Sequence, residues 1–217
     1  MGKTILVLGP SGSGKSTSMR NLPQDEVAVL NVLGKPLPFR TPLPKMDFPS
    51  YEDITRKLEA NRRRCFVIDD STYLMQLENF AYANVKGYDK FTTMAVNFQK
   101  LVMAALRTDD DTTVYFLHHS DTGDDGREKP KTIGRMLDER FCLEGAFPIV
   151  IDCRVKDGRH EFVTVNDDGQ SICKAPMGML PEVMDNDLAE VDRLVREYWG
   201  MAPLGAEKEK GPKEEEN

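Results

Sequence analysis

The segment at residues 4–17, TILVLGPSGSGKST, limits what this chain can fold into more than any other stretch. Residues 4–8 are apolar or β-favouring and predict a buried strand. The GPSGSGKS that follows fits the pattern G-x-x-x-x-G-K-[ST] at every fixed position. Its glycines allow backbone N–H groups to point inward at a phosphate, and a helix expected at residues 16–22 adds the positive end of its dipole. The segment therefore predicts a loop that binds a nucleoside triphosphate.

We expect this loop to supply most of the nucleotide contacts. Lys15 is placed to reach the β- and γ-phosphates, where it serves binding and catalysis, and the Ser16 hydroxyl can ligate Mg²⁺. The alternative, a glycine-rich turn with a chance lysine, is disfavoured by the strand before the loop and the helix after it. The predicted cofactors are ATP and Mg²⁺, and the predicted nucleotide contacts are Gly9, Pro10, Ser11, Gly12, Ser13, Gly14, Lys15, Ser16 and Thr17.

Size and charge limit the class of protein. A chain of 217 residues is long enough for one α/β domain, and no apolar run approaches the ~20 residues of a membrane span. The four cysteines show no C-x-x-C spacing, so we expect reduced thiols and a cytoplasmic location. Because the net charge is −7, any contact with nucleic acid must come from a local basic patch.

A second apolar run, at residues 65–70 (CFVIDD), predicts a strand that ends in two carboxylates. The carboxyl ends of parallel strands meet at one edge of the sheet, so this strand ends beside the phosphate loop. Asp69 can then hold Mg²⁺ together with Ser16. The arginines at residues 62–64 precede the strand, and we expect them to be solvated at the opposite edge rather than to bind nucleic acid.

The remaining elements complete an α/β pattern. Further strands are expected at residues 26–33, 113–117, 148–155 and 161–166, the last two as an antiparallel pair. Further helices are expected at residues 51–61, 71–83, 92–107, 133–143 and 187–199. Five prolines exclude long regular structure from residues 34–49, and residues 121–132 read as a mobile surface loop. We expect one domain over residues 1–200 and a disordered, charged tail over residues 201–217.

Two further stretches carry candidate functional residues. The strand at residues 113–117 ends in His118 and His119, and one of them, for which we choose His119, can face the γ-phosphate. The connection at residues 84–91 interleaves aromatic and basic residues, which can stack bases and hold phosphates. The alternative is an ordinary connection between two helices. The residues that would contact nucleic acid there are Lys86, Tyr88, Lys90 and Phe91.

Beyond the phosphate loop, five blocks resemble short RecA-like ATPases of bacteriophages, some of which are described as single-strand annealing proteins. The blocks are FVIDD (66–70), GYDKF (87–91), FLHH (116–119), KTIGRMLD (131–138) and KAPMGM (174–179). The resemblance covers about residues 3–198. It implies a P-loop NTPase with a RecA-like core, a mostly parallel central sheet flanked by helices, and a C-terminal antiparallel strand pair and helix. It also implies ATP hydrolysis, slow and stimulated by DNA, and a role in annealing or recombination.

The resemblance further implies the partners and the DNA contacts. Single-stranded DNA is the expected partner, together with a single-strand binding protein and further copies of the chain, in the host cytoplasm if a phage encodes it. Contacts to DNA are implied for residues 84–91 and for residues 120–132, the latter through Arg127, Lys129 and Lys131. The two lysines have an alternative role, which is to reach the γ-phosphate of a neighbouring subunit.

This sequence departs from the RecA pattern in two places. The phosphate loop begins at residue 9, so the segment that RecA-type recombinases use for polymerisation has no counterpart before it. In RecA-type proteins a catalytic glutamate usually follows the strand that comes after the phosphate-loop helix. The equivalent strand here ends at residues 31–34, and no glutamate is present there. Asp70 is our candidate for positioning the attacking water, and the alternative is that it only braces Ser16 or Asp69.

Two other functions compete with this interpretation. GPSGSGKST is also typical of guanylate kinases, and Lys129, Arg135 and Arg140 could form a lid over two nucleotides. However, a kinase of this type needs several arginines to clamp the phosphate of the acceptor nucleotide. The segment after the first helix offers Arg40 and no further cluster. The third reading is a nucleotide-gated module that binds a protein partner with little turnover. Phosphate release with single-stranded DNA, or phosphate transfer to a monophosphate, separates these functions.

Overall fold

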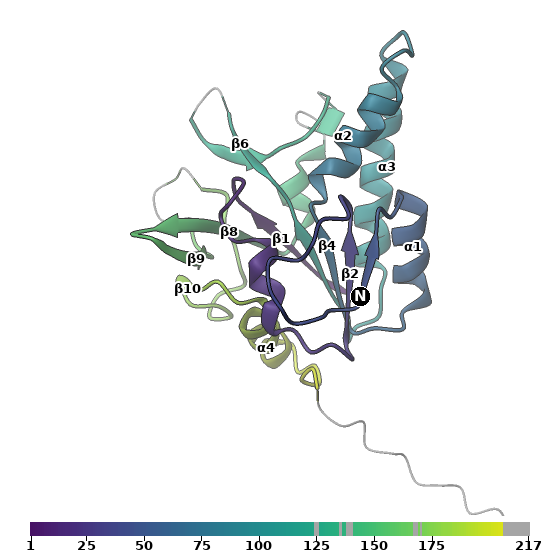
Figure 1. Ribbon diagram of the computed structural model, residues 1–217. Coiled ribbons are helices and arrows are strands. Elements are labelled where there is room, and N and C mark those ends of the chain that lie inside the picture. The colour runs from purple at the N-terminus through teal and green to yellow at the C-terminus, as the bar shows by residue number, and fades with distance from the viewer. Residues whose placement is uncertain (124–125, 135, 138–140, 167–168, 170, 206–217) are drawn as a thin grey trace, which may run out of the picture.

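A twisted eight-stranded sheet forms the centre of the molecule (Figure 1). The computed structural model describes residues 1–123, 126–134, 136–137, 141–166, 169 and 171–205. In space the strands follow the order β10 (Val183–Asp185), β9 (Arg159–Val163), β8 (Ile149–Lys156), β1 (Lys3–Leu8), β5 (Thr113–Leu117), β4 (Cys65–Asp69), β2 (Val27–Asn31) and β3 (Lys45–Asp47). The strands from β8 to β3 are parallel, whereas β9 and β10 are antiparallel to their neighbours.

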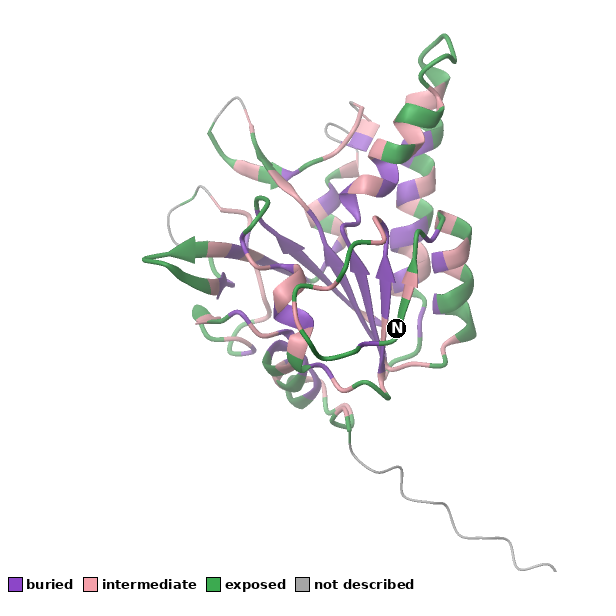
Figure 2. Cartoon of the chain, viewed as in Figure 1, coloured by how far each residue is buried: buried purple, intermediate pink, exposed green. Residues whose placement is uncertain are grey.

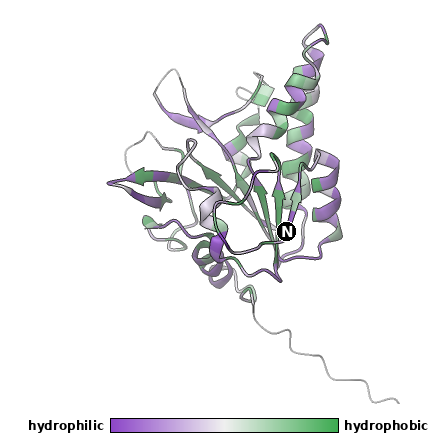
Figure 3. Cartoon of the chain, in the orientation of Figure 1, coloured by the Kyte–Doolittle hydropathy of each residue, from purple (hydrophilic) through white to green (hydrophobic). Residues whose placement is uncertain are grey.

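The central strands are buried on both faces, as their continuous apolar sequences predict. Every residue of β4 and β5 is buried, and Figures 2 and 3 show the central strands as the most buried and most hydrophobic part of the chain. β5 lies between β1 and β4, with Phe116 opposite both Leu6 and Ile68. The carboxyl ends of these three strands therefore meet at one edge of the sheet.

Helices cover the two faces of the sheet and create two apolar cores. On one face lie α1 (Tyr51–Ala60), α2 (Thr72–Ala81) and α3 (Asp89–Leu106), and on the other lie α4 (Leu188–Tyr198) and the 3-10 helix η1 (Ser16–Asn21). The predicted stripe on α3 is confirmed, since Met94, Phe98, Leu101, Val102 and Ala105 are all buried. Within the described residues, no helix combines the length and the hydrophobicity needed to cross a bilayer.

Much of the expected architecture is confirmed. The sheet is mostly parallel, β8 and β9 form the predicted antiparallel pair, and α4 forms near the C-terminus. The expected α-helix at residues 16–22 is instead the six-residue 3-10 helix η1, which ends before Pro23, where the ring would oppose a further helical turn. The short edge strands β3 and β10 were not predicted, because three residues carry too little pattern.

The segment expected to be a surface loop contains a second, two-stranded sheet. β6 (Ser120–Thr122) pairs antiparallel with β7 (Glu128–Pro130), so the prediction of an irregular loop was wrong for these strands. Four of the eleven residues of the helix expected at 133–143, namely 135 and 138–140, lie outside the described residues. The 3-10 helix η3 (Leu143–Ala146) begins at the last residue of the expected helix. Of the tail predicted to be disordered, residues 201–217, residues 206–217 lie outside the described residues. Residues 201–205 are described, and the carbonyl oxygens of Ala202 and Pro203 accept hydrogen bonds from Arg64.

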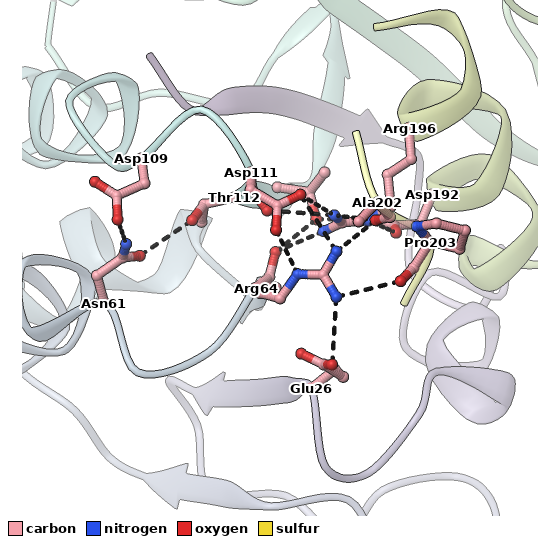
Figure 4. A network of polar contacts seen from close by, with 11 residues as sticks. Glu26, Asn61, Arg64, Asp109, Asp111, Thr112, Asp192, Arg196, Ala202 and Pro203 are labelled. Atoms are coloured by element: carbon pink, nitrogen blue, oxygen red, sulfur yellow. Dashed lines mark hydrogen bonds and ion pairs between the residues drawn. The ribbon is translucent and has the colours of Figure 1, made fainter. Parts of the chain in front are cut away.

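A polar network joins the amino ends of β4 and β5 to α4 and the segment after it (Figure 4). Arg196 is 1% exposed and pairs with Asp192 at 2.5 Å and Asp111 at 3.0 Å. Arg64 bonds the same Asp111 at 2.5 Å and donates to the carbonyl oxygen of Ala202. Arg64 is therefore not the solvated residue that we expected at this strand entry, because its guanidinium holds the end of the described chain against the sheet.

Candidate functional site

The glycine-rich loop, residues 9–16, connects β1 to η1 at the carboxyl edge of the sheet. Gly14 has φ +104°, a conformation that other residues rarely adopt. At Gly9 an added Cβ would lie 2.3 Å from the carbonyl oxygen of Cys153, so the close approach of the loop to β8 also requires glycine. The backbone of this loop therefore requires glycine at both positions.

Lys15 lies inside this loop with its side chain buried. Its ammonium group donates to the carbonyl oxygens of Gly9 at 2.7 Å and Pro10 at 2.8 Å. Burial lowers the pKa of Lys15, although the nearby Cys153 and Asp70 act in the opposite direction. A cation held at the centre of a concave backbone favours an anionic ligand there, because a phosphate oxygen makes stronger, charge-assisted hydrogen bonds than a carbonyl.

The far side of the loop is supported by residues that sequence reasoning missed. The carbonyl oxygen of Ser13 accepts hydrogen bonds from His160 Nδ1 at 2.7 Å and from Cys153 Sγ at 3.3 Å. Burial raises the pKa of Cys153 to about 11, so the thiol keeps the proton that it donates. Asn186 in turn donates to the sulfur at 3.1 Å. No sequence motif announces these contacts, since they join the loop to segments about 140 to 170 residues away.

Ser16 and Asp69, predicted as the metal ligands, are in direct contact. Ser16 Oγ donates to Asp69 Oδ1 at 2.8 Å, which brings the end of β4 against the start of η1. Burial, followed by repulsion from Asp70, raises the pKa of Asp69 to about 6. Ser16 and Asp69 thus offer two oxygen atoms of the kind that Mg²⁺ prefers, and they would be the protein's ligands if this metal bound here.

Asp70 is the centre of a second polar group at the site. It has φ +62°, in the left-handed region that aspartate tolerates better than most residues. Lys35 Nζ lies 2.7 Å from one carboxylate oxygen, and His119 Nε2 lies 3.4 Å from the other. Burial favours the neutral acid, but His119 and Lys35 outweigh it and lower the pKa of Asp70. Lys35 follows β2 in a segment without a motif, which is why it was missed.

The two histidines after β5 have different environments. His118 is fully buried, and burial lowers its pKa to about 3, so it is neutral. Its Nε2–H donates to the carbonyl oxygen of Lys131 at 2.9 Å, which leaves Nδ1 to accept from the Ser71 hydroxyl at 2.9 Å. His119 instead lies beside Asp70, with its ring edge-on to Tyr73. His118 therefore has a structural role, and His119, the predicted catalytic residue, is the one that faces the site.

The β6–β7 hairpin is attached directly to the glycine-rich loop. The backbone N–H of Ser120 donates to the carbonyl oxygen of Gly9 at 3.3 Å, and that of Lys131 donates to His119 at 2.8 Å. Near this junction, burial and the neighbouring carboxylate of Glu128 raise the pKa of Asp152 to about 7. A backbone hydrogen bond thus joins the base of the hairpin to the first residue of the loop.

The residues predicted to contact DNA are distributed over two projections. In the α2–α3 connection, which extends beyond the sheet in Figure 1, Tyr88 is 87% exposed and Lys86 is also exposed. Phe91 is half-buried against the core, and Lys90 donates to the carbonyl oxygen of Tyr82 at 3.2 Å. The same projection carries a residue that was not predicted, Phe80, with 77% of its surface exposed.

The other predicted contacts, Arg127, Lys129 and Lys131, lie on or beside the β6–β7 hairpin. Lys129 is paired in register with Asp121, and Arg127 and Lys129 both take part in polar or electrostatic interactions. These cations are therefore partly engaged within the chain. Asp124 and Asp125, which weaken the positive potential of this segment in the sequence, lie outside the described residues.

Comparisons with known proteins do not identify a family. No protein-family model matches the chain, and no curated protein matches it. The assignment of a function therefore depends on the geometry of the loop, the carboxylates and the exposed projections.

Proposed function

We propose that the chain binds ATP with Mg²⁺ at the glycine-rich loop and hydrolyses it. The observation that carries this proposal is the contact between Ser16 and Asp69 at 2.8 Å, beside the buried ammonium of Lys15. A cation, a hydroxyl and a carboxylate thus lie together at the glycine-rich loop, which supports binding of a metal–phosphate complex there. Bound Mg·ATP supplies the phosphoanhydride and the metal charge.

The loop also fits a phosphate in detail. The Ser13 hydroxyl oxygen is buried and makes no hydrogen bond within the described part of the chain, so it is free to bond a ligand oxygen. Lys15 would exchange the two carbonyl oxygens that it now contacts for phosphate oxygens. Ser16 and Asp69 would hold the metal. For Lys15, the change would replace hydrogen bonds from a cation to neutral carbonyl oxygens with ones to charged phosphate oxygens, which are stronger.

Asp70 and His119 are suited to orient a water molecule for attack. The lowered pKa of Asp70 keeps it ionised at neutral pH, where it accepts hydrogen bonds from a water but is a weak base. His119 Nε2 is buried and makes no hydrogen bond in the described residues. Lys35 pairs with Asp70 at 2.7 Å, and its proposed role is to hold the Asp70 carboxylate in position.

The order of strands favours a RecA-like ATPase over a nucleoside monophosphate kinase. β5 separates the strand before the glycine-rich loop from the strand that ends at Asp69. Its last residues lead into His119, so a polar side chain faces both the loop and the carboxylates. In the RecA-like pattern, a polar residue follows a later strand of the sheet. His119, which follows β5, occupies that position here. The mostly parallel sheet with helices on both faces agrees with the same proposal.

We further propose that single-stranded DNA is the partner and that the protein acts in annealing or recombination, with additional copies of itself and a single-strand binding protein. Tyr88 offers an exposed ring for base stacking, and Lys86 lies two residues away. The attachment of the β6–β7 hairpin to Gly9 provides a route by which bound nucleotide can change a DNA-binding segment.

A phosphate-release assay tests the function. The full-length protein with ATP and Mg²⁺ should release phosphate slowly, and an oligodeoxythymidylate should increase the rate several-fold. Lys15→Ala should show neither activity. Phosphate transfer to GMP or AMP would contradict the ATPase in favour of the kinase, and absence of both reactions despite ATP binding would favour a nucleotide-gated binding module.

A further inference from the structure

A groove of about 620 Å³ lies between α1 and the edge strand β3, away from the glycine-rich loop. The half-buried side chains of Ala28 and Met46 lie at its floor together with Phe66, and these three residues belong to or pack against the core beneath α1. Its rim carries the basic residues Lys45, Arg56, Lys57, Arg62 and Arg63. We call it the basic groove. Among the described residues that line it, none is acidic.

Part of this positive charge is not neutralised within the chain. Arg56 pairs with Glu52 at 3.2 Å, and Lys45 pairs with Asp47. In contrast, Lys57 and Arg62 have no polar partner among the described residues. In a chain of net charge −7, an apolar floor beside two uncompensated cations is an unusual local surface.

The backbone around the groove is firmly held and also offers hydrogen bonds. Arg64 follows the rim residues and is locked in the network of Figure 4, which fixes the chain that displays Arg62 and Arg63. β3 is the last strand of the sheet, so one side of its backbone has no strand beside it. An extended peptide can pair with such an edge and place alternate side chains over the adjoining surface.

We propose that the basic groove binds an extended acidic peptide that carries apolar side chains. Carboxylates would pair with Lys57 and Arg62, and the apolar side chains would cover Met46 and the floor. A nucleic acid fits less well, because the only aromatic residue among the described lining, Phe66, is 1% exposed and cannot stack a base. Because the groove adjoins the amino end of β4, such a peptide and a ligand at the glycine-rich loop can bind together.

Fluorescence anisotropy with defined probes tests this proposal on the full-length protein. The probe is a labelled peptide of six glutamates followed by two leucines, and the comparison probes are the glutamates alone and an oligodeoxythymidylate of equal charge. The double variant Lys57→Glu/Arg62→Glu removes the free cations. Arg107→Glu is the matched control, since it reverses an exposed charge outside the groove.

The leucine-bearing peptide should bind with an affinity that falls as salt rises, and the double variant should bind it at least about ten-fold more weakly. The Arg107→Glu control should remain within about two-fold of the parent. Loss of the leucines should weaken binding to the parent by about ten-fold. Absence of peptide binding, equal binding by the double variant, or equal binding of the peptide without leucines would each overturn the proposal. Tighter binding of the oligodeoxythymidylate, lost in the same variant, would overturn it in favour of a nucleic-acid surface.

Discussion

Ser16 Oγ and Asp69 Oδ1 are joined by a hydrogen bond of 2.8 Å, although 53 residues separate them in the chain. This contact connects the glycine-rich loop with the carboxyl end of β4, two strands away in the sheet. It also holds a hydroxyl and a carboxylate where a metal ion can use both oxygens.

Asp69→Asn should reduce ATP affinity about ten- to hundred-fold with Mg²⁺ and leave it nearly unchanged in EDTA, because the amide keeps the shape but loses the charge. Titration calorimetry in both buffers measures the difference. In the parent protein, metal-free Asp69 has a pKa of about 6, so Mg²⁺ must compete with a proton below that pH, and the Mg²⁺ concentration needed for tight ATP binding should rise as pH falls. Equal affinities of variant and parent with Mg²⁺ would refute the metal role of Asp69.

Asp70→Asn should spare ATP binding and lower the hydrolysis rate by at least about ten-fold, because the variant lacks the charge that orients water. Steady-state phosphate release together with calorimetry separates the two effects. Hydrolysis at the parental rate would show that Asp70 only braces its neighbours.

Lys35→Met should act through Asp70. Since contact with Lys35 helps to lower the pKa of Asp70, its loss should shift the acidic limb of the kcat profile to higher pH. A merely structural role would change stability without moving that limb. Lys100→Met, an exposed lysine on α3, is the control and should keep the parental profile.

The pair of Asp152 and Glu128 predicts a pH dependence of stability. In the folded protein the pKa of Asp152 is raised from 3.8 to about 7, so between these values the folded state holds more protons than the unfolded chain. Stability contributed by this group therefore falls as pH rises from about 4 to 7, and the penalty is complete above 7. Asp152→Asn removes the penalty.

Urea unfolding measures the effect of Asp152→Asn. At pH 4 the variant and the parent should differ little, whereas at pH 8 the variant should be more stable by about 1–2 kcal/mol, after allowance for partial solvent exposure. Asp157→Asn, in the exposed turn between β8 and β9, is the control and should show no such trend. A stability difference that does not change with pH would contradict the assignment.

The exposed projection makes a prediction about DNA. Tyr88→Ala should weaken binding of single-stranded DNA about five- to hundred-fold, the equivalent of one stacked base, without changing the unfolding midpoint. Phe91→Ala should instead destabilise the fold by about 1–3 kcal/mol, because this ring packs against the core. DNA binding unaffected by Tyr88→Ala would remove this ring from the interface.

Lys129 and Lys131 distinguish DNA contact from contact between subunits. If they hold DNA, replacing both with alanine should lower DNA affinity and reduce its dependence on salt. If they reach a neighbour's nucleotide, DNA affinity should persist while DNA-stimulated hydrolysis is lost. We expect the first result, measured by anisotropy over a range of salt concentrations. Unchanged values in both assays would exclude both roles.

The parts of the fold that could be predicted are those with a strong local pattern. β1, β4 and β5 are continuous apolar runs, and each was placed within about one residue. The antiparallel partner of β8 could be predicted because Asp157 and Gly158 form a recognisable turn. β6 and β7 lacked such a signal, since polar three-residue strands resemble a loop in sequence. β6 bonds the glycine-rich loop through Ser120, and β7 pairs with β6.

The residues of the site likewise divide into those that a local motif predicts and those that the tertiary fold brings in. Lys15, Ser16 and Asp69 belong to motifs that can be read from the sequence, whereas Lys35, Cys153 and His160 reach the site only because the sheet brings distant segments together. Tyr88 and Phe91 look equivalent in sequence, but one is exposed and the other packs against the core. Burial of this kind depends on the tertiary fold, and local composition cannot supply it.

The central claim is that Lys15 binds the phosphates of ATP, and calorimetry of the parent protein and Lys15→Ala tests it most directly. The parent should bind ATP with Mg²⁺. Lys15→Ala should bind ATP about ten- to hundred-fold more weakly, because it lacks the charged hydrogen bonds from the ammonium group to phosphate. Circular dichroism should show the same fold for both proteins, because the hydrogen bonds of the Lys15 ammonium within the described residues are to two carbonyls of its own loop. Equal ATP affinity of the parent and Lys15→Ala, or no ATP binding by the parent, would contradict the account.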